Sequence, residues 1–147
     1  MTVPSDPGLL AGRTILITGA ARRVGRRLAL AMATAGARVV VHYHTSASDA
    51  ASLQQEVQDA GGQLAQVAGD LTDPATAEGL VARASEPFGP LDGLVNNASL
   101  FAPGEALSTS LAEWRRYQAI HAEAPFLLSR EFARQLPDGR DGVIVNL

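Results

Sequence analysis

Short segments rich in β-branched residues alternate with longer helical segments along the chain, and this alternation constrains the fold more than any other feature. The predicted strands are residues 13–18, 37–43, 63–68, 91–96 and 142–147. The predicted helices are residues 24–35, 48–60 and 73–85, and a long helix that begins after Ser110. Strands joined in this way form right-handed crossovers. We therefore predict an α/β fold, a doubly wound parallel sheet of the Rossmann type with five strands, in one domain over residues 1–147.

The long helix combines a strong start signal with an internal proline. Ser110 and Glu113 have the spacing of a capping box. Pro125 predicts a kink or a break, because proline lacks the N–H group that a helix interior needs. The predicted apolar face consists of Leu111, Trp114, Tyr117, Ile120, Ala124, Leu127 and Leu128.

Composition excludes several classes of function. A net charge of −3 gives no general basic field, so we expect no nucleic acid and no membrane as a partner. Without cysteine, the chain has no disulfides, thiolate metal sites or thiol nucleophiles. No apolar run approaches the roughly 20 residues of a membrane span. Residues 1–12 lack the apolar core of a signal peptide, so we expect a cytoplasmic location.

A glycine turn follows the first predicted strand, in the stretch LITGAARRVGRRLA at 16–29. Gly19 permits a tight turn, and Gly25 would let the backbone approach a pyrophosphate at the start of the next helix. The four arginines in this stretch are a local feature of an otherwise acidic chain. A plain strand-to-helix connection in a flavodoxin-like, FMN-binding protein is the alternative at this point.

Three motifs resemble those of the short-chain dehydrogenase/reductase family. In the Thr-Gly-x3-Gly-x-Gly pattern of that family, Thr18, Gly19 and Gly25 match, and Arg23 replaces the middle glycine. Asp70, in GDLTD, matches the acid that contacts adenine. Asn96-Asn97-Ala98 matches the end of the fourth strand, with Ser99 where the family has glycine.

Three further stretches, TGAARRVG, VHYHTSA and NNASLF, resemble the pteridine reductase branch, which includes folate- and monapterin-reducing relatives. This resemblance implies that Arg22 and Arg23 contact the cofactor, whereas we expect Arg26 and Arg27 to lie on a solvated helix face. It also implies that Phe101 stacks on the substrate. A loop phenylalanine that caps the core is the alternative for Phe101.

The segment after the second strand favours NADP(H) over NAD(H). It contains no carboxylate before Asp49, so nothing in residues 42–46 would repel a 2′-phosphate. Arg22 can pair with that phosphate, and Thr45 and Ser46 can donate hydroxyl hydrogen bonds. His42 and His44 could instead bind a metal, but no third ligand lies nearby in the sequence, and we predict none. The predicted cofactor-binding residues are Gly19, Arg22, Arg23, Val24, Gly25, His44, Thr45, Ser46, Asp70, Leu71, Asn97, Ala98 and Ser99.

The catalytic residues that the resemblance implies are absent from this chain. A short-chain reductase needs a Tyr-x3-Lys pair, but the chain has no lysine, and its tyrosines at 43 and 117 are followed four residues later by alanine and histidine. The family serine would follow residue 147. We therefore expect the chain to be an N-terminal portion, inactive alone, of a domain with roughly 100 further residues. His121 stands where many members have a proton-relay asparagine; a merely tolerated polar residue is the alternative.

Two functions are consistent with these residues. The first is an NADPH-dependent short-chain oxidoreductase that transfers hydride to a carbonyl or imine of a small molecule, such as a pteridine. The second is a nucleotide-binding module without catalytic activity. By resemblance, we also expect a homo-oligomer, a dimer or tetramer, formed through the helix at 111–136.

Overall fold

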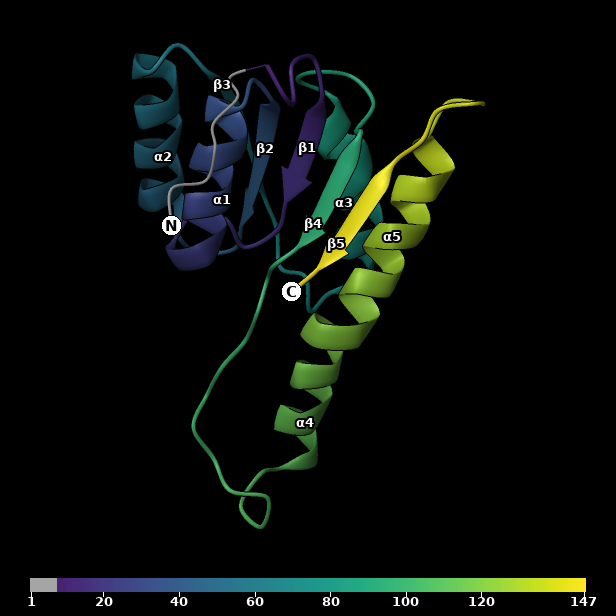
Figure 1. Cartoon of the computed structure of the whole chain (residues 1–147). Helices are drawn as coiled ribbons and strands as arrows, with labels where there is room; N and C mark the ends of the chain where they lie inside the picture. Colours follow the sequence, from purple (N-terminus) through teal and green to yellow (C-terminus); the bar gives the residue numbers. More distant parts are fainter. Residues whose placement is uncertain (1–7) are drawn as a thin grey trace.

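The computed structural model describes residues 8–147 and contains a five-stranded sheet in which every pairing is parallel. The strands are β1 Thr14–Ile17, β2 Arg38–Tyr43, β3 Gln63–Ala68, β4 Gly93–Asn96 and β5 Val143–Asn146. Their order in the sheet is β3-β2-β1-β4-β5 (Figure 1). This order confirms the Rossmann fold and excludes the flavodoxin-like alternative, whose order is 2-1-3-4-5. The predicted lack of a signal peptide concerns residues 1–12, of which 1–7 lie outside the described residues.

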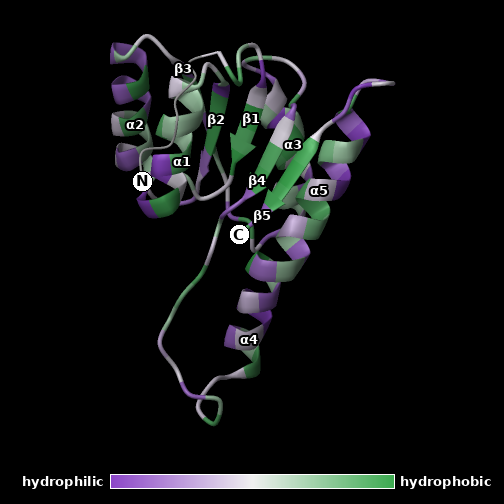
Figure 2. Cartoon of the chain, in the orientation of Figure 1, coloured by the Kyte–Doolittle hydropathy of each residue, from purple (hydrophilic) through white to green (hydrophobic). Residues whose placement is uncertain are grey.

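Helices cover both faces of the sheet. They are α1 Arg23–Thr34, α2 Ala47–Asp59, α3 Pro74–Ser85, α4 Leu111–Gln118 and α5 Ala124–Gln135, with a π-helical segment, η1 Ala119–Glu123, between the last two. Ile15 and Ile17 of β1 pack with residues of α1 and α2, whereas Leu16 packs with residues of α3 and α5. Both faces of the sheet are therefore buried at β1, which explains why β1 and the middle of β2 are apolar (Figure 2).

The predicted helix starts are confirmed by their caps. The Asp73 carboxylate accepts a hydrogen bond from the Thr76 N–H at 2.9 Å, and Pro74 occupies the first position of α3. At α4, the Ser110 hydroxyl accepts from the Glu113 N–H while the Glu113 carboxylate accepts from the Ser110 N–H. This is the reciprocal capping box, and the Ser110 hydrogen bonds hold the pKa of Glu113 below its ordinary value.

The predicted long helix is interrupted where the proline indicated, but its apolar face is only partly buried. Pro125 is the second residue of α5, and the wider turn of η1 precedes it. A proline ring at this position would collide with the carbonyl of residue 121 in a regular α-helix, so the wider turn relieves that contact. Leu111 and Trp114 are 61% and 55% exposed. The reason is visible in Figure 1, because α4 extends beyond the end of the sheet and faces no strand.

β5 forms one edge of the sheet within residues 8–147. It pairs only with β4 there, and its Val143 side chain is 63% exposed. Over the same residues, no helix is both long and apolar enough to cross a membrane.

Candidate cofactor site

The candidate site lies at the carboxyl edge of the sheet, where the loops after β1, β2, β3 and β4 meet. From β1, the chain adds β2 and β3 on one side of the sheet and then β4 and β5 on the other side. The strand order therefore reverses between β1 and β4. In open α/β sheets, ligands bind in the crevice at this reversal. The predicted cofactor residues all lie in these four loops or in the first turn of α1.

The chain packs so closely at Gly19 and Gly25, in and just after the turn that follows β1, that a larger residue does not fit at either position. Gly19 has φ 61°, and a Cβ atom there would lie 2.8 Å from the Cα of Ala98. Gly25 is buried, and a Cβ atom there would lie 2.6 Å from both the Cα of Ala20 and Nδ2 of Asn97. Gly25 thus lets α1 approach the end of β4, a packing role beyond the predicted approach to a pyrophosphate.

Arg23 adopts the backbone conformation of a glycine. Its φ of 53° is the only positive value among the non-glycine residues of 8–147. Arg22, the N-cap residue of α1, makes no side-chain hydrogen bond to the first turn. Because no side chain caps it, the N-terminus of α1 is open to an anion.

The strain at Arg23 gives a stability prediction. Replacement of Arg23 by glycine should give a free energy of unfolding about 1 kcal/mol higher than replacement by alanine, because alanine keeps the unfavourable left-handed conformation. At Arg27, exposed in the interior of α1, the order should reverse, with glycine about 1 kcal/mol below alanine. Urea unfolding of the four variants measures both differences. The same order at both positions would contradict the strained conformation.

Two of the four arginines, Arg22 and Arg26, make ion pairs, and the pair of Arg26 shows that its predicted position on a solvated face is wrong. Nε of Arg22 lies 3.7 Å from a carboxylate oxygen of Asp49, and both side chains are substantially exposed. Arg26 was expected on a solvated face, but it is only 26% exposed and forms an ion pair of 2.5 Å with Glu56. It also donates to the carbonyl of Asp49, because α2 packs beside α1. Arg27 is exposed, as predicted.

Thr18 and Asn97 tie the end of β1 to the end of β4. The buried Thr18 hydroxyl accepts hydrogen bonds from the N–H groups of Asn97 at 3.0 Å and Ala98 at 2.9 Å. In return, the Asn97 amide donates to the carbonyls of Thr18 at 2.8 Å and Gly19 at 3.2 Å. This network fixes the floor of the crevice. The sequence motif contained Thr18, but its anchoring role was not predicted.

His42 is a second residue whose role sequence reasoning missed. It is 2% exposed, and its Nδ1 accepts from the Gly19 N–H at 3.2 Å. Its Nε2 lies 3.0 Å from the Gly69 carbonyl oxygen. Burial lowers its pKa to about 4. Both ring nitrogens are therefore engaged by the protein, and no group of three potential metal ligands occurs within residues 8–147.

The loop after β3 presents a fixed carboxylate. Oδ1 of Asp70 accepts from both the N–H and the hydroxyl of Thr72, at 2.9 and 2.7 Å, and these bonds hold its pKa below the ordinary value. Its Oδ2 lies 3.8 Å from Nε2 of the exposed His44. Leu71 is buried in the core, so its main chain is the part that can contact a ligand.

The loop after β2 supplies the hydroxyls of the predicted 2′-phosphate subsite. Thr45 is exposed, and Ser46 is the N-cap of α2 but makes no side-chain capping hydrogen bond. Asp49, the first carboxylate after β2, lies in the first turn of α2 and faces Arg22.

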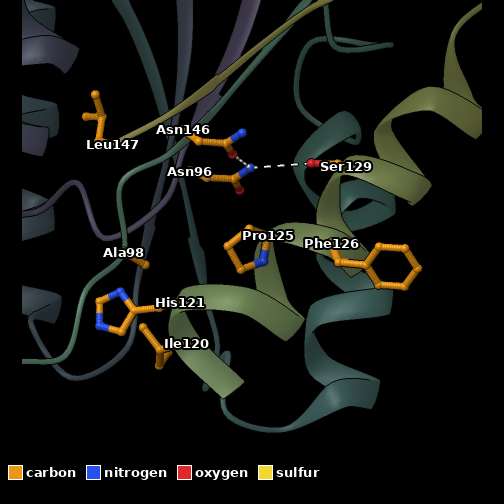
Figure 3. A pocket seen from close by; sticks show the side chains of 9 residues that line it. All are labelled: Asn96, Ala98, Ile120, His121, Pro125, Phe126, Ser129, Asn146 and Leu147. Carbon is orange, nitrogen blue, oxygen red and sulfur yellow. Dashed lines mark hydrogen bonds between the residues drawn. The ribbon is translucent and has the colours of Figure 1, made fainter. Parts of the chain in front are cut away.

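A cavity of about 380 Å³ lies beside the crevice, between the ends of β4 and β5 and the η1–α5 segment (Figure 3). Nε2 of His121 lies at its wall, 3.1 Å from the carbonyl oxygen of Leu100, and the imidazole stacks on Tyr117. Nδ2 of the buried Asn96 donates to Oδ1 of Asn146 at 2.8 Å, whereas Oδ1 of Asn96 has no hydrogen-bond partner.

The loop from β4 to α4 carries Ser99 and Phe101, both exposed. Phe101 is 84% exposed, so the alternative that it caps the core is wrong. The hydroxyl of Tyr117 bonds to the N–H and the carbonyl of Ala102, at 2.6 and 3.0 Å, and so ties this loop to α4.

A parallel sheet with an uncapped helix N-terminus at its strand-order reversal is typical of dinucleotide-binding enzymes. The family model for short chain dehydrogenases matches residues 13–147, and the chain therefore belongs to the short-chain dehydrogenase family. This confirms the resemblance of the three motifs.

Individual relatives agree with this assignment. The chain is 34% identical over 146 residues to a short-chain type dehydrogenase/reductase of Picea abies, covering 94% of this chain and 54% of the relative. It is 40% identical over 128 residues to the hydroxyacyl-CoA dehydrogenase ChsB1 of Mycobacterium tuberculosis, covering 84% of this chain and 40% of the relative. The chain thus spans about half the length of the curated relatives it matches.

Similar solved structures include the FolM alternative dihydrofolate reductase 1 from Brucella canis complexed with NADP. It aligns with a TM-score of 0.88 and 34% identity over 94% of this chain and 55% of that chain. A short chain dehydrogenase from Burkholderia cenocepacia in complex with NADP aligns with a TM-score of 0.87 and 32% identity over 94% of this chain and 56% of that chain. The first agrees with the resemblance to the pteridine reductase branch.

Proposed function

We propose that the chain is the cofactor-binding portion of an NADPH-dependent short-chain reductase. The observation that carries the proposal is the uncapped N-terminus of α1, held by Gly19 and Gly25 against the Thr18–Asn97 network at the strand-order reversal. The bound NADP of the structural relatives supports the same cofactor class. Bound NADPH would supply the hydride for reduction of a carbonyl or imine.

The residues present fit this cofactor. The first turn of α1 would hold the pyrophosphate, Asp70 and Leu71 would hold the adenine, and Asn97 and Ala98 would lie beside the nicotinamide ribose. Arg22, Thr45 and Ser46 would hold the 2′-phosphate. The exposed Arg22–Asp49 contact is weak enough for that phosphate to replace, because exposed ion pairs contribute only about 0–1 kcal/mol.

The substrate side of the proposal rests on His121 and Phe101. His121 would hold or pass a proton at Nε2, within reach of the cavity beside Asn96. Phe101, exposed on the loop after β4, would stack on a flat substrate such as a pteridine. The similarity to an alternative dihydrofolate reductase supports this substrate class.

The absence of lysine from the chain favours a second candidate, a nucleotide-binding module without catalysis. The two candidates share the cofactor site and differ in the turnover of the complete protein, because this chain alone is expected to be inactive in either case. Reduction of a dihydropteridine by the complete protein with consumption of NADPH would support the first, and tight NADPH binding by the complete protein without turnover of any carbonyl or imine substrate would support the second.

The cofactor preference is tested by fluorescence titration with NADPH and NADH. We expect NADPH to bind at least about tenfold more tightly, because Arg22 makes a charge-assisted contact with the 2′-phosphate. Replacement of Arg22 by glutamine should weaken NADPH binding by about tenfold and leave NADH binding unchanged. The matched control is Arg27→Gln on the exposed face of the same helix, which should change neither. Equal or tighter binding of NADH by the unmodified protein would overturn the preference.

A further inference from the structure

We propose that His42 is a positioning residue of the cofactor site, whose ring holds the glycine turn after β1 and the loop after β3 at a fixed separation. This inference rests on the proposed function, because it concerns a ligand that touches both loops. His42 itself lies on β2, between β1 and β3, and is buried.

Each of the two loops is attached to the end of β2 twice. The Ala20 N–H donates to the carbonyl of His42 at 2.9 Å, and the Gly19 N–H donates to the ring at 3.2 Å. On the other side, the Gly69 N–H donates to the carbonyl of Tyr43 at 3.0 Å, and the Gly69 carbonyl faces Nε2 of His42 at 3.0 Å. The imidazole is therefore a side-chain bridge between two loops that are each also bonded to the main chain of β2.

The partners fix the tautomer of the ring. A backbone N–H can only donate and a backbone carbonyl can only accept, so Nδ1 must be unprotonated and Nε2 must carry the proton. Burial keeps the ring neutral, with a pKa of about 4; nearby Arg83 and His44 act in the same direction, whereas the Gly69 carbonyl and Asp70 oppose them. A charged ring would lose the bond from Gly19.

The consequence is specific to a ligand that spans the site. The pyrophosphate of a dinucleotide would lie on the turn that contains Gly19, and its adenine would lie beside Asp70, the residue after Gly69. A dinucleotide can contact both loops at once only if the distance between the loops is correct. A displacement of one loop by about 1 Å is sufficient to weaken these contacts. A ligand that contacts one loop does not depend on the spacing.

The test compares NADP⁺ with adenosine, a fragment that lacks both the pyrophosphate and the 2′-phosphate and would therefore contact the loop after β3 but not the glycine turn, in calorimetric titrations of His42→Leu. We expect the affinity for NADP⁺ to fall by at least about tenfold and that for adenosine by less than about threefold. His42→Asn retains an acceptor near Nδ1, and His42→Gln retains a donor near Nε2, so each should restore part of the NADP⁺ affinity. These two variants decide the question if the leucine variant does not fold.

¹⁵N NMR of the histidine rings provides an independent measurement of the protonation state and tautomer of His42. It should show His42 neutral, with the proton on Nε2, at pH 7 and down to about pH 5. Unchanged NADP⁺ affinity in the folded variants, a parallel loss for NADP⁺ and adenosine, or a proton on Nδ1 would each overturn the inference. Failure of the unmodified protein to bind NADP⁺ would instead overturn the proposed function, and the inference with it.

Discussion

Replacement of Gly25 by alanine is expected to destabilise the protein by about 3 kcal/mol or more and to abolish measurable NADPH binding. The new methyl group would lie 2.6 Å from the Cα of Ala20 and from Nδ2 of Asn97, and 2.9 Å from the carbonyl oxygen of Gly19. Two of these three atoms belong to the backbone, so no rotation of a flexible side chain can remove the contacts. The first turn of α1 must move away from β4, and the Asn97 hydrogen bonds to Thr18 and Gly19 are lost with it.

Gly79 provides the matched control for this substitution. It lies inside α3, and a Cβ atom there would have nothing within 4 Å. Gly79→Ala should therefore raise the free energy of unfolding by up to about 1 kcal/mol and leave NADPH affinity unchanged. Urea unfolding and cofactor titration of the two variants measure the contrast. A folded Gly25→Ala protein with normal affinity would contradict the packing derived for the turn.

Replacement of Asp92 by alanine is expected to lower the free energy of unfolding by about 3 kcal/mol without a change in the cofactor affinity of the folded protein. Asp92 precedes β4 at the sheet edge opposite the site, and its side chain is 4% exposed. It accepts a hydrogen bond from the Thr14 N–H at 2.8 Å and pairs with Arg13 at 3.1 Å and with Arg140. Without the carboxylate, a buried N–H and two guanidinium groups lose their partner.

The carboxylate of Asp92 also predicts that the stability of the protein depends on pH. Burial would raise the pKa of Asp92, but the hydrogen bonds from Thr14, Arg140 and Arg13 outweigh it and hold the pKa below the ordinary value. A carboxyl with a lowered folded-state pKa stabilises the protein fully above about pH 4, and this contribution is lost as the pH falls through the folded value. Thermal unfolding of the unmodified protein and of Asp92→Ala should therefore converge in acid. Asp138→Ala, at an exposed loop position, should stay within about 0.5 kcal/mol of the unmodified protein; a similar small effect for Asp92→Ala would contradict the anchoring role.

The strands and most helix boundaries could be predicted because their determinants are local. The strand at 63–68 was predicted with the observed ends, and the caps at Asp73 and Ser110 lie within four residues of their partners. The π-helical segment could not be predicted, because a pattern read at 3.6 residues per turn contains no signal for a wider turn. The exposure of Leu111 and Trp114 could not be predicted for another reason. An apolar stripe on a helix does not show whether another part of the protein packs against that stripe.

The location of the site was predictable in outline. Loops after parallel strands meet at one edge, so Gly19, Asp70 and Asn97 had to lie near one another. The bridging role of His42 depends on two loops that lie 23 and 27 residues away in the chain, and on burial that no local pattern reveals. Arg26 was misjudged similarly, because its partner Glu56 belongs to a helix whose packing beside α1 is a tertiary property.

The central claim is that the carboxyl edge of the sheet binds a phosphorylated dinucleotide, and the most direct measurement follows the backbone amide resonances during the NADPH and NADH titrations. The predicted result is a saturable shift of the amides of residues 19–25, of Asp70 and of Asn97 and Ala98, at a lower concentration of NADPH than of NADH. The contradictory result is the absence of shifts in these segments at saturating NADPH, or shifts confined to residues outside this edge.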